Sequence, residues 1–67
     1  MNFFAENLKT LRKESGLLQR ELADKLHLTK NAFSGWEVGR NQPDYDTLLL
    51  ICDIFDITAD EILRTKL

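Results

Sequence analysis

The chain has 67 residues, of which 43% are hydrophobic and 30% are charged, and its formal net charge is −2. This composition is that of one small globular domain, not of a disordered tail, and a chain of this length buries only about 60% of its unfolded surface. No apolar run approaches the roughly 20 residues needed to span a bilayer, and no signal-peptide pattern opens the chain, which indicates a cytoplasmic protein without a membrane partner.

The first predicted helix covers about residues 2–14. Phe4, Leu8 and Leu11 recur in it at i, i+4 and i+7, the spacing of one helix face, and Gly16 ends it. This helix is expected to turn one apolar stripe toward the core.

Residues 17–39 predict two short amphipathic helices joined by a few residues. Thr29 is the expected start of the second helix, since its hydroxyl can accept a hydrogen bond from a free backbone amide. Gly39 is its expected end, because glycine adopts the left-handed conformation found just past a helix. Helix, tight turn and helix form the outline of a DNA-reading unit, whose second helix lies in the major groove. The residues expected on the inward faces are Leu22, Ala23 and Leu26 in the first helix, and Phe33 and Trp36 in the second.

Two further helices are predicted after a loop over residues 40–43. Asp44 is a plausible cap for the first of them, and Thr58 and Glu61 form the capping-box pattern that opens the second. Since no strand-like alternation occurs, the expected fold class is all-α, with five helices in one domain. The inward residues of the last two helices are expected to be Leu48, Ile51, Cys52, Phe55, Ile62 and Leu63.

The chain resembles the Cro/CI-type, or lambda-repressor-like, family of helix-turn-helix proteins over nearly its whole length. The resemblance implies a compact five-helix DNA-binding domain over residues 1–67, with the helix-turn-helix at about residues 18–38. The residues that carry it are Leu11–Arg12, Gln19, Glu21–Leu22–Ala23, Trp36–Glu37, Gly39, Pro43, Leu48, Ile57 and Ile62–Leu63.

The resemblance also implies an ion pair between Arg12 of the first helix and Glu37 near the end of the third. A guanidinium–carboxylate fork between them would fix the angle of the third helix. The alternative is that Arg12 and Glu37 are two unrelated surface charges.

In family members that bind operators, the first residues of the third helix reach base edges. Lys30 suits the acceptors of guanine, Asn31 can bond adenine in a bidentate way, and Ser34 could reach a base or a phosphate. Gln19 opens the second helix, where free amides suit a phosphate, although it could simply be a solvated first-turn residue. The residues expected at the DNA backbone are Gln19, Thr29, Arg40, Asn41 and Gln42.

Three residues depart from the family pattern. Gly35 stands where operator-reading members usually carry a long polar side chain, so we expect one base contact fewer and a short or degenerate half-site. Leu18 replaces the usual Ser or Thr cap of the second helix, which leaves one backbone amide without a side-chain acceptor from the cap residue. His27 replaces a turn glycine, and histidine tolerates positive φ better than most residues.

The sequence therefore predicts a transcriptional regulator, a repressor in our interpretation, that binds a double-stranded operator. The competing interpretation is an antirepressor or antitoxin-like module that binds protein on the same fold. An enzyme is excluded by the lack of a nucleophile beside a base, a glycine-rich phosphate loop or a His/Cys ligand set. We expect no cofactor, metal or small-molecule ligand, and the single cysteine, Cys52, is predicted to be a core residue.

The charges divide unevenly along the chain. Residues 1–40 carry seven basic and five acidic side chains (+2), and residues 41–67 carry two basic and six acidic ones (−4). Such a dipolar domain can still present a positive face to phosphate. Homodimerisation is predicted from apolar residues that lie off the inward stripes, namely Leu49, Leu50, Ile54 and Leu67.

Overall fold

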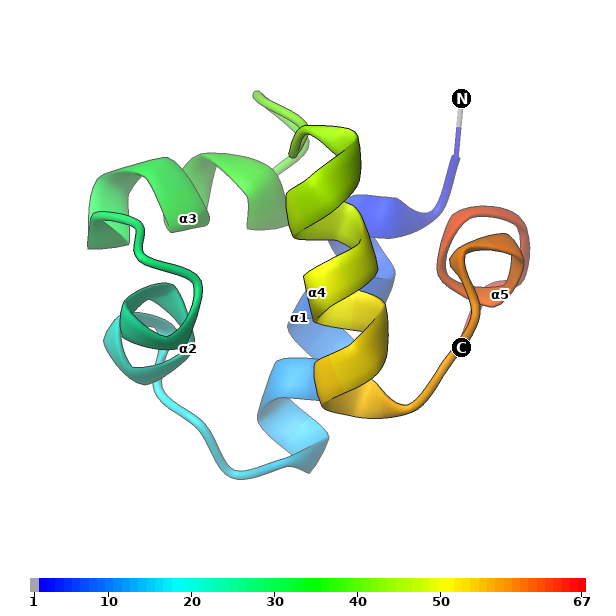
Figure 1. Ribbon diagram of the computed structural model, residues 1–67, viewed down its shortest axis with the longest axis horizontal. Coiled ribbons are helices and arrows are strands. Elements are labelled where there is room, and N and C mark those ends of the chain that lie inside the picture. The colour runs from blue at the N-terminus through cyan, green and yellow to red at the C-terminus, as the bar shows by residue number, and fades with distance from the viewer. Residues whose placement is uncertain (1) are drawn as a thin grey trace.

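The computed structural model describes residues 2–67, which contain five helices and no strand. The helices are α1 (Phe4–Glu14), α2 (Gln19–Lys25), α3 (Lys30–Glu37), α4 (Tyr45–Phe55) and α5 (Ala59–Arg64). In the view of Figure 1, α2 and α3 lie on one side of the molecule, α5 lies on the other, and α1 and α4 run between them. The predicted all-α, five-helix fold is confirmed.

The start of α1 was predicted at about Asn2, and the helix begins at Phe4. The side-chain oxygen of Asn2 accepts a hydrogen bond of 2.9 Å from the backbone N–H of Phe4. Asn2, which lies before the helix, therefore satisfies a free backbone amide of the first turn, as polar residues before a helix commonly do. The end of α1 is as predicted, with Gly16 in the left-handed region at φ 74°.

The turn between α2 and α3 has the backbone geometry that the sequence predicts. His27 is left-handed, with φ 59°, and the hydroxyl of Thr29 accepts a bond of 3.2 Å from the N–H of Ala32. At the start of α2, the N–H of Leu18 donates to the carboxylate of Glu21 at 2.7 Å. Leucine has no acceptor to offer in return, so α2 begins with only half of a capping box.

One predicted cap does not form. Asp44 directly precedes α4, but its carboxylate accepts the hydroxyl of Thr47 and no backbone amide. The capping box of α5 is present as predicted, with Thr58 and Glu61 each accepting the other's amide at 3.0 Å. Between these helices, Asp56 is left-handed at φ 53°, a conformation that aspartate adopts more readily than most residues and that ends α4 without a glycine.

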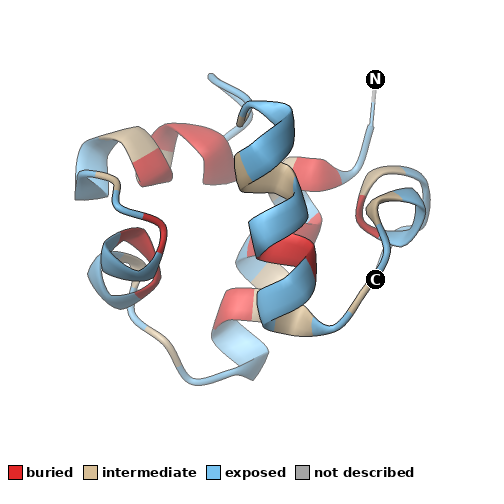
Figure 2. Ribbon diagram, viewed as in Figure 1, coloured by how far each residue is buried: buried red, intermediate tan, exposed pale blue. Residues whose placement is uncertain are grey.

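The core lies where the inward faces of the helices meet, as the colouring of Figure 2 shows. Phe33 of α3 is completely buried, and its ring centroid lies 6.4 Å from that of Trp36. The predicted residues Leu11, Leu48, Phe55 and Leu63 are only partly buried around this core. The buried apolar residues are Phe4, Leu8, Leu22, Ala23, Leu26, Phe33, Trp36, Ile51, Cys52 and Ile62.

Asn7 is a buried polar residue that the sequence did not single out. Its amide nitrogen donates to the carbonyl oxygens of Ile62 at 2.8 Å and Thr65 at 2.7 Å. Its amide oxygen accepts the N–H of Leu67 at 2.9 Å. Asn7 thus satisfies carbonyls near the end of α5, which otherwise would lack partners, and fastens α5 to α1.

Cys52 is expected to be protected from thiol reagents in the folded protein. It is 5% exposed, and burial, with a further contribution from the charge of Asp53, raises the pKa of the thiol. Because the thiolate is the reactive form, labelling by iodoacetamide at pH 8 should be slow in buffer and fast in urea. Equal rates in buffer and in urea would contradict the buried position of Cys52.

Candidate nucleic-acid interface

A buried ion pair joins α1 to α3. The Nε atom of Arg12 lies 2.6 Å from Oε2 of Glu37, and Nη2 lies 3.2 Å from Oε1, so the two groups meet as a fork. Their side chains are 10% and 1% exposed, and the remaining Nη1 of Arg12 donates to the carbonyl of Leu17 at 2.8 Å. Arg12 and Glu37 are therefore not independent surface charges, and they fix the end of α3 against α1.

The polar contacts continue from this pair into α2. The amide nitrogen of Gln19 donates to Oε1 of Glu37 at 2.9 Å, and the hydroxyl of Ser34 donates to the amide oxygen of Gln19 at 3.2 Å. We call Arg12, Glu37, Gln19 and Ser34 the polar network. Because it includes one residue from α1, one from α2 and two from α3, it sets the relative positions of all three helices. One amide hydrogen of Gln19 is left for an external acceptor.

The outward face of α3 carries the residues that were predicted to read bases. Lys30 and Asn31 are exposed, whereas Phe33 and Trp36 point into the core. Ser34 is half-buried, and its hydroxyl is directed toward the side chain of Gln19 in α2. The cap residue Thr29 is exposed, and its hydroxyl hydrogen is free to donate, since the oxygen accepts the bond of the cap.

A shallow basic hollow lies beside the start of α3. It is lined by Arg12, Leu18, Gln19, Arg20 and Lys30. Because the charge of Arg12 is paired with Glu37, Arg20 and Lys30 supply the available positive charges beside the first turn of α2. An anion such as a phosphate suits this combination of charge and free amides. Arg20 was missed in the sequence, although its place next to Gln19 was a usable signal.

The loop after α3 folds back against the helix. The backbone N–H groups of Arg40 and Asn41 both donate to the carbonyl oxygen of Gly35, at 2.9 Å and 3.3 Å. Gly39 makes this turn possible, because its φ of 79° is a left-handed conformation that glycine adopts freely. Arg40, Asn41 and Gln42 are all exposed.

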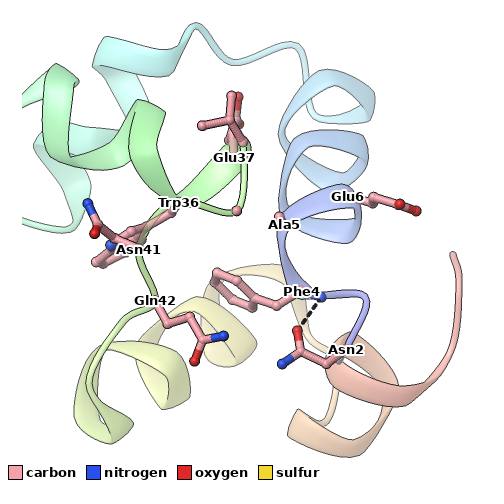
Figure 3. Close-up of a pocket in the computed structure, with 10 residues that line it drawn as sticks. Asn2, Phe4, Ala5, Glu6, Trp36, Glu37, Asn41 and Gln42 are labelled. Carbon is pink, nitrogen blue, oxygen red and sulfur yellow. Dashed lines mark hydrogen bonds between the residues drawn. The ribbon is translucent and has the colours of Figure 1, made fainter.

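A second hollow separates this loop from the start of α1. Figure 3 shows Asn41 and Gln42 on one side of it and Asn2 and Phe4 on the other, while the carboxylate of Glu6 points away. Gln42 therefore lines this second hollow, next to α1, and not the basic hollow beside the start of α3. Within residues 2–67, no group of three or more His, Cys, Asp or Glu side chains could hold a metal ion, and no helix is long and apolar enough to cross a membrane.

A family model described as Helix-turn-helix matches residues 8–62 of this chain. The chain is 44% identical over 61 residues to an uncharacterized HTH-type transcriptional regulator, YqaE, of Bacillus subtilis, which covers 91% of this chain and 53% of YqaE. It is 38% identical over 60 residues to the HTH-type transcriptional activator BcrR of Enterococcus faecalis, covering 90% of this chain and 29% of BcrR. The chain thus spans about half, or less, of the length of these relatives.

Solved structures share the fold. A transcriptional regulator from Listeria innocua superimposes with a TM-score of 0.90 and 30% identity, over 94% of this chain and 59% of that one. The SOS-response transcriptional repressor LexA from Eubacterium rectale gives a TM-score of 0.87 and 26% identity, over 97% of this chain and 70% of that one.

Removing the carboxylate of Glu37 should destabilise the domain severely. The Glu37→Ala variant leaves the guanidinium of Arg12 buried without its partner, which typically costs about 3–5 kcal/mol of unfolding free energy. Urea denaturation followed by tryptophan fluorescence measures the loss. The exposed variant Lys66→Ala is the control and should change the free energy of unfolding by less than about 0.5 kcal/mol. A Glu37→Ala variant as stable as this control would contradict the importance of the ion pair.

Proposed function

Because this chain belongs to the Cro/CI-type helix-turn-helix family, we propose that it is a sequence-specific, DNA-binding transcriptional regulator that reads the major groove with α3. The family consists of transcriptional regulators, not of enzymes. The observation that carries the proposal is the polar network, which holds α3 rigidly with Lys30 and Asn31 exposed at its first turn. Rigid presentation lowers the entropic cost of docking a helix into a groove.

Lys30 and Asn31 are the proposed base-reading residues of the first turn. Their donors and acceptors match the major-groove edges of guanine and adenine, respectively. Ser34 acts in this proposal by orienting Gln19, because its hydroxyl is already bonded to that side chain.

Phosphate contacts are proposed on both sides of α3. Gln19 offers its remaining amide hydrogen next to the charges of Arg20 and Lys30 in the basic hollow. Thr29, which directly precedes Lys30, offers its hydroxyl hydrogen. Asn41 and Gln42 offer donors at the far end of the helix. Contacts on both sides of a groove fix the register of the protein on the duplex without reading its sequence.

We propose that the regulator represses transcription. The named relatives include both an activator and a repressor, so the preference rests on a physical argument. A domain bound across a promoter excludes polymerase by its volume alone, whereas activation needs a further surface for polymerase.

The experiment that tests the function is selection of bound DNA from a random pool, followed by gel shifts of the selected site at low and moderate salt. Sequence-specific binding predicts an enriched motif that survives the higher salt. If no motif is enriched and no DNA is shifted, DNA recognition is wrong and the protein-binding alternative is favoured.

The Asn31→Ala variant should relax the base preference at one base pair per half-site. Loss of a bidentate contact costs about 1–3 kcal/mol of discrimination against the wrong base. The measurement is a titration of wild type and variant against every single-base variant of the selected site. Gln42→Ala is the matched control, since loss of a phosphate contact should weaken all these sites alike. An unchanged base profile in Asn31→Ala would refute its assignment.

We further propose that two copies bind paired half-sites. The outward face of α4 exposes two apolar pairs at helical spacing, Tyr45 with Leu49 and Leu50 with Ile54. The exposed carboxylates of Asp46 and Asp53 lie on the same face, so association in free solution should be weak. Two-fold pairing would set the recognition helices about 34 Å apart, which matches half-sites one helical turn apart.

Dimerisation predicts cooperative binding to a paired site. In the Leu49→Gln/Leu50→Gln variant, the affinity for the paired site should fall to that for a single half-site, whereas single half-site binding should stay unchanged. Fluorescence anisotropy with both DNA duplexes measures the two affinities. Wild-type protein that binds the paired duplex without cooperativity, and sediments as a monomer on it, would exclude the dimer.

A further inference from the structure

Gly35 lies on the outward face of α3 and is nevertheless buried. It follows Asn31 by four residues, which places both on the side of the helix opposite Phe33 and Trp36. Asn31 is exposed, as expected for this side. Since glycine has no side chain, groups from elsewhere in the chain must cover its backbone.

The covering groups come from the loop after α3. A Cβ atom placed on Gly35 would lie 3.0 Å from Nη2 of Arg40, 3.4 Å from Nε of Arg40 and 3.0 Å from Nδ2 of Asn41. The two backbone hydrogen bonds to the carbonyl of Gly35 hold the loop in this position. The guanidinium of Arg40 and the side-chain amide of Asn41 therefore border the space that a side chain at position 35 would fill.

This position suits base recognition better than contact with the DNA backbone. Within residues 2–67, Arg40 pairs with no carboxylate, so its planar fork of donors is free for a ligand. A guanidinium on the groove-facing side of a recognition helix can bond O6 and N7 of guanine in a bidentate way. Because Gly35 has no side chain, the planar guanidinium of Arg40 can lie close to the helix backbone.

We propose that Arg40 is a base-reading residue that selects guanine, and that Gly35 is its positioning residue. The inference rests on the proposed function, since it assumes that α3 lies in the major groove. It replaces the sequence-based expectation that Gly35 simply removes a base contact and that Arg40 binds phosphate. Four helical residues span about 6 Å, so Arg40 would read a base pair beyond the one that Asn31 reads.

The test compares base profiles of the 67-residue chain on a site selected with the wild type. Wild type, Arg40→Ala, Gly35→Ala, the Arg40→Ala/Gly35→Ala double variant and Asn41→Ala are titrated against every single-base variant of that site. Gly35→Ala should fold normally, because alanine favours a helix and the crowded atoms belong to the ends of flexible side chains. Circular dichroism confirms folding before each titration.

Arg40→Ala should reduce the preference for guanine at one base pair per half-site by about 5- to 150-fold, the factor equivalent to one bidentate contact. Gly35→Ala should reduce the preference at the same base pair, and the double variant should show no further change, because Gly35 acts through Arg40. Asn41→Ala should keep the guanine preference.

A uniform loss of affinity across all sites in Arg40→Ala would overturn the inference, since that is the signature of a phosphate contact. An unchanged profile in Gly35→Ala, or a guanine preference that depends on Asn41, would also overturn it. In each of these results the wild type still selects a motif, so the proposed function stands. If the wild type selects no motif, the proposed function fails and the inference fails with it.

Discussion

The position of α3 depends on the buried ion pair between Arg12 and Glu37. A helix of eight residues is too short to be stable alone, so α3 takes its stability and its direction from the rest of the domain. Phe33 and Trp36 bury its inward face, but apolar contacts tolerate small rotations. A forked ion pair does not, because a misplaced carboxylate would leave a charge without a partner in a poorly hydrated interior. The pair therefore selects one orientation of α3, and the hydrogen bond from Gln19 to Glu37 fixes α2 relative to it.

Local sequence signals predicted the existence and approximate ends of all five helices. The apolar spacing in α1 to α5, the cap at Thr29, the capping box at Thr58 and the left-handed His27 each depend on residues close together in the chain. The cap at Asp44 was wrong, and α1 begins at Phe4 instead of about Asn2, since a polar side chain near a helix start can bond to any of several partners of similar strength. The side chain of Asn2 accepts a hydrogen bond from the N–H of Phe4, two residues further on. The carboxylate of Asp44 accepts a hydrogen bond from the hydroxyl of Thr47 in place of a backbone amide.

The candidate interface was less predictable, because its geometry depends on contacts between distant or flexible segments. Family resemblance supplied the pairing of Arg12 with Glu37, but nothing in the sequence indicated that Gln19 and Ser34 would join it. Gly35 was expected only to remove a base contact, because the identity of a residue does not show which loop packs against it. Only the path of the chain after Gly39 places Arg40 and Asn41 over it.

The three hydrogen bonds of Asn7 have a consequence for the order of folding. They join residues 55 to 60 positions apart, and α5, with six residues, cannot persist as an isolated helix. Closing so long a loop costs entropy that these bonds and the burial of Ile62 must offset together. Helix α5 therefore becomes stable only when α1 is in place, so it should form after α1. In native-state hydrogen exchange, the amides of α5 should lose their protection together when these contacts open.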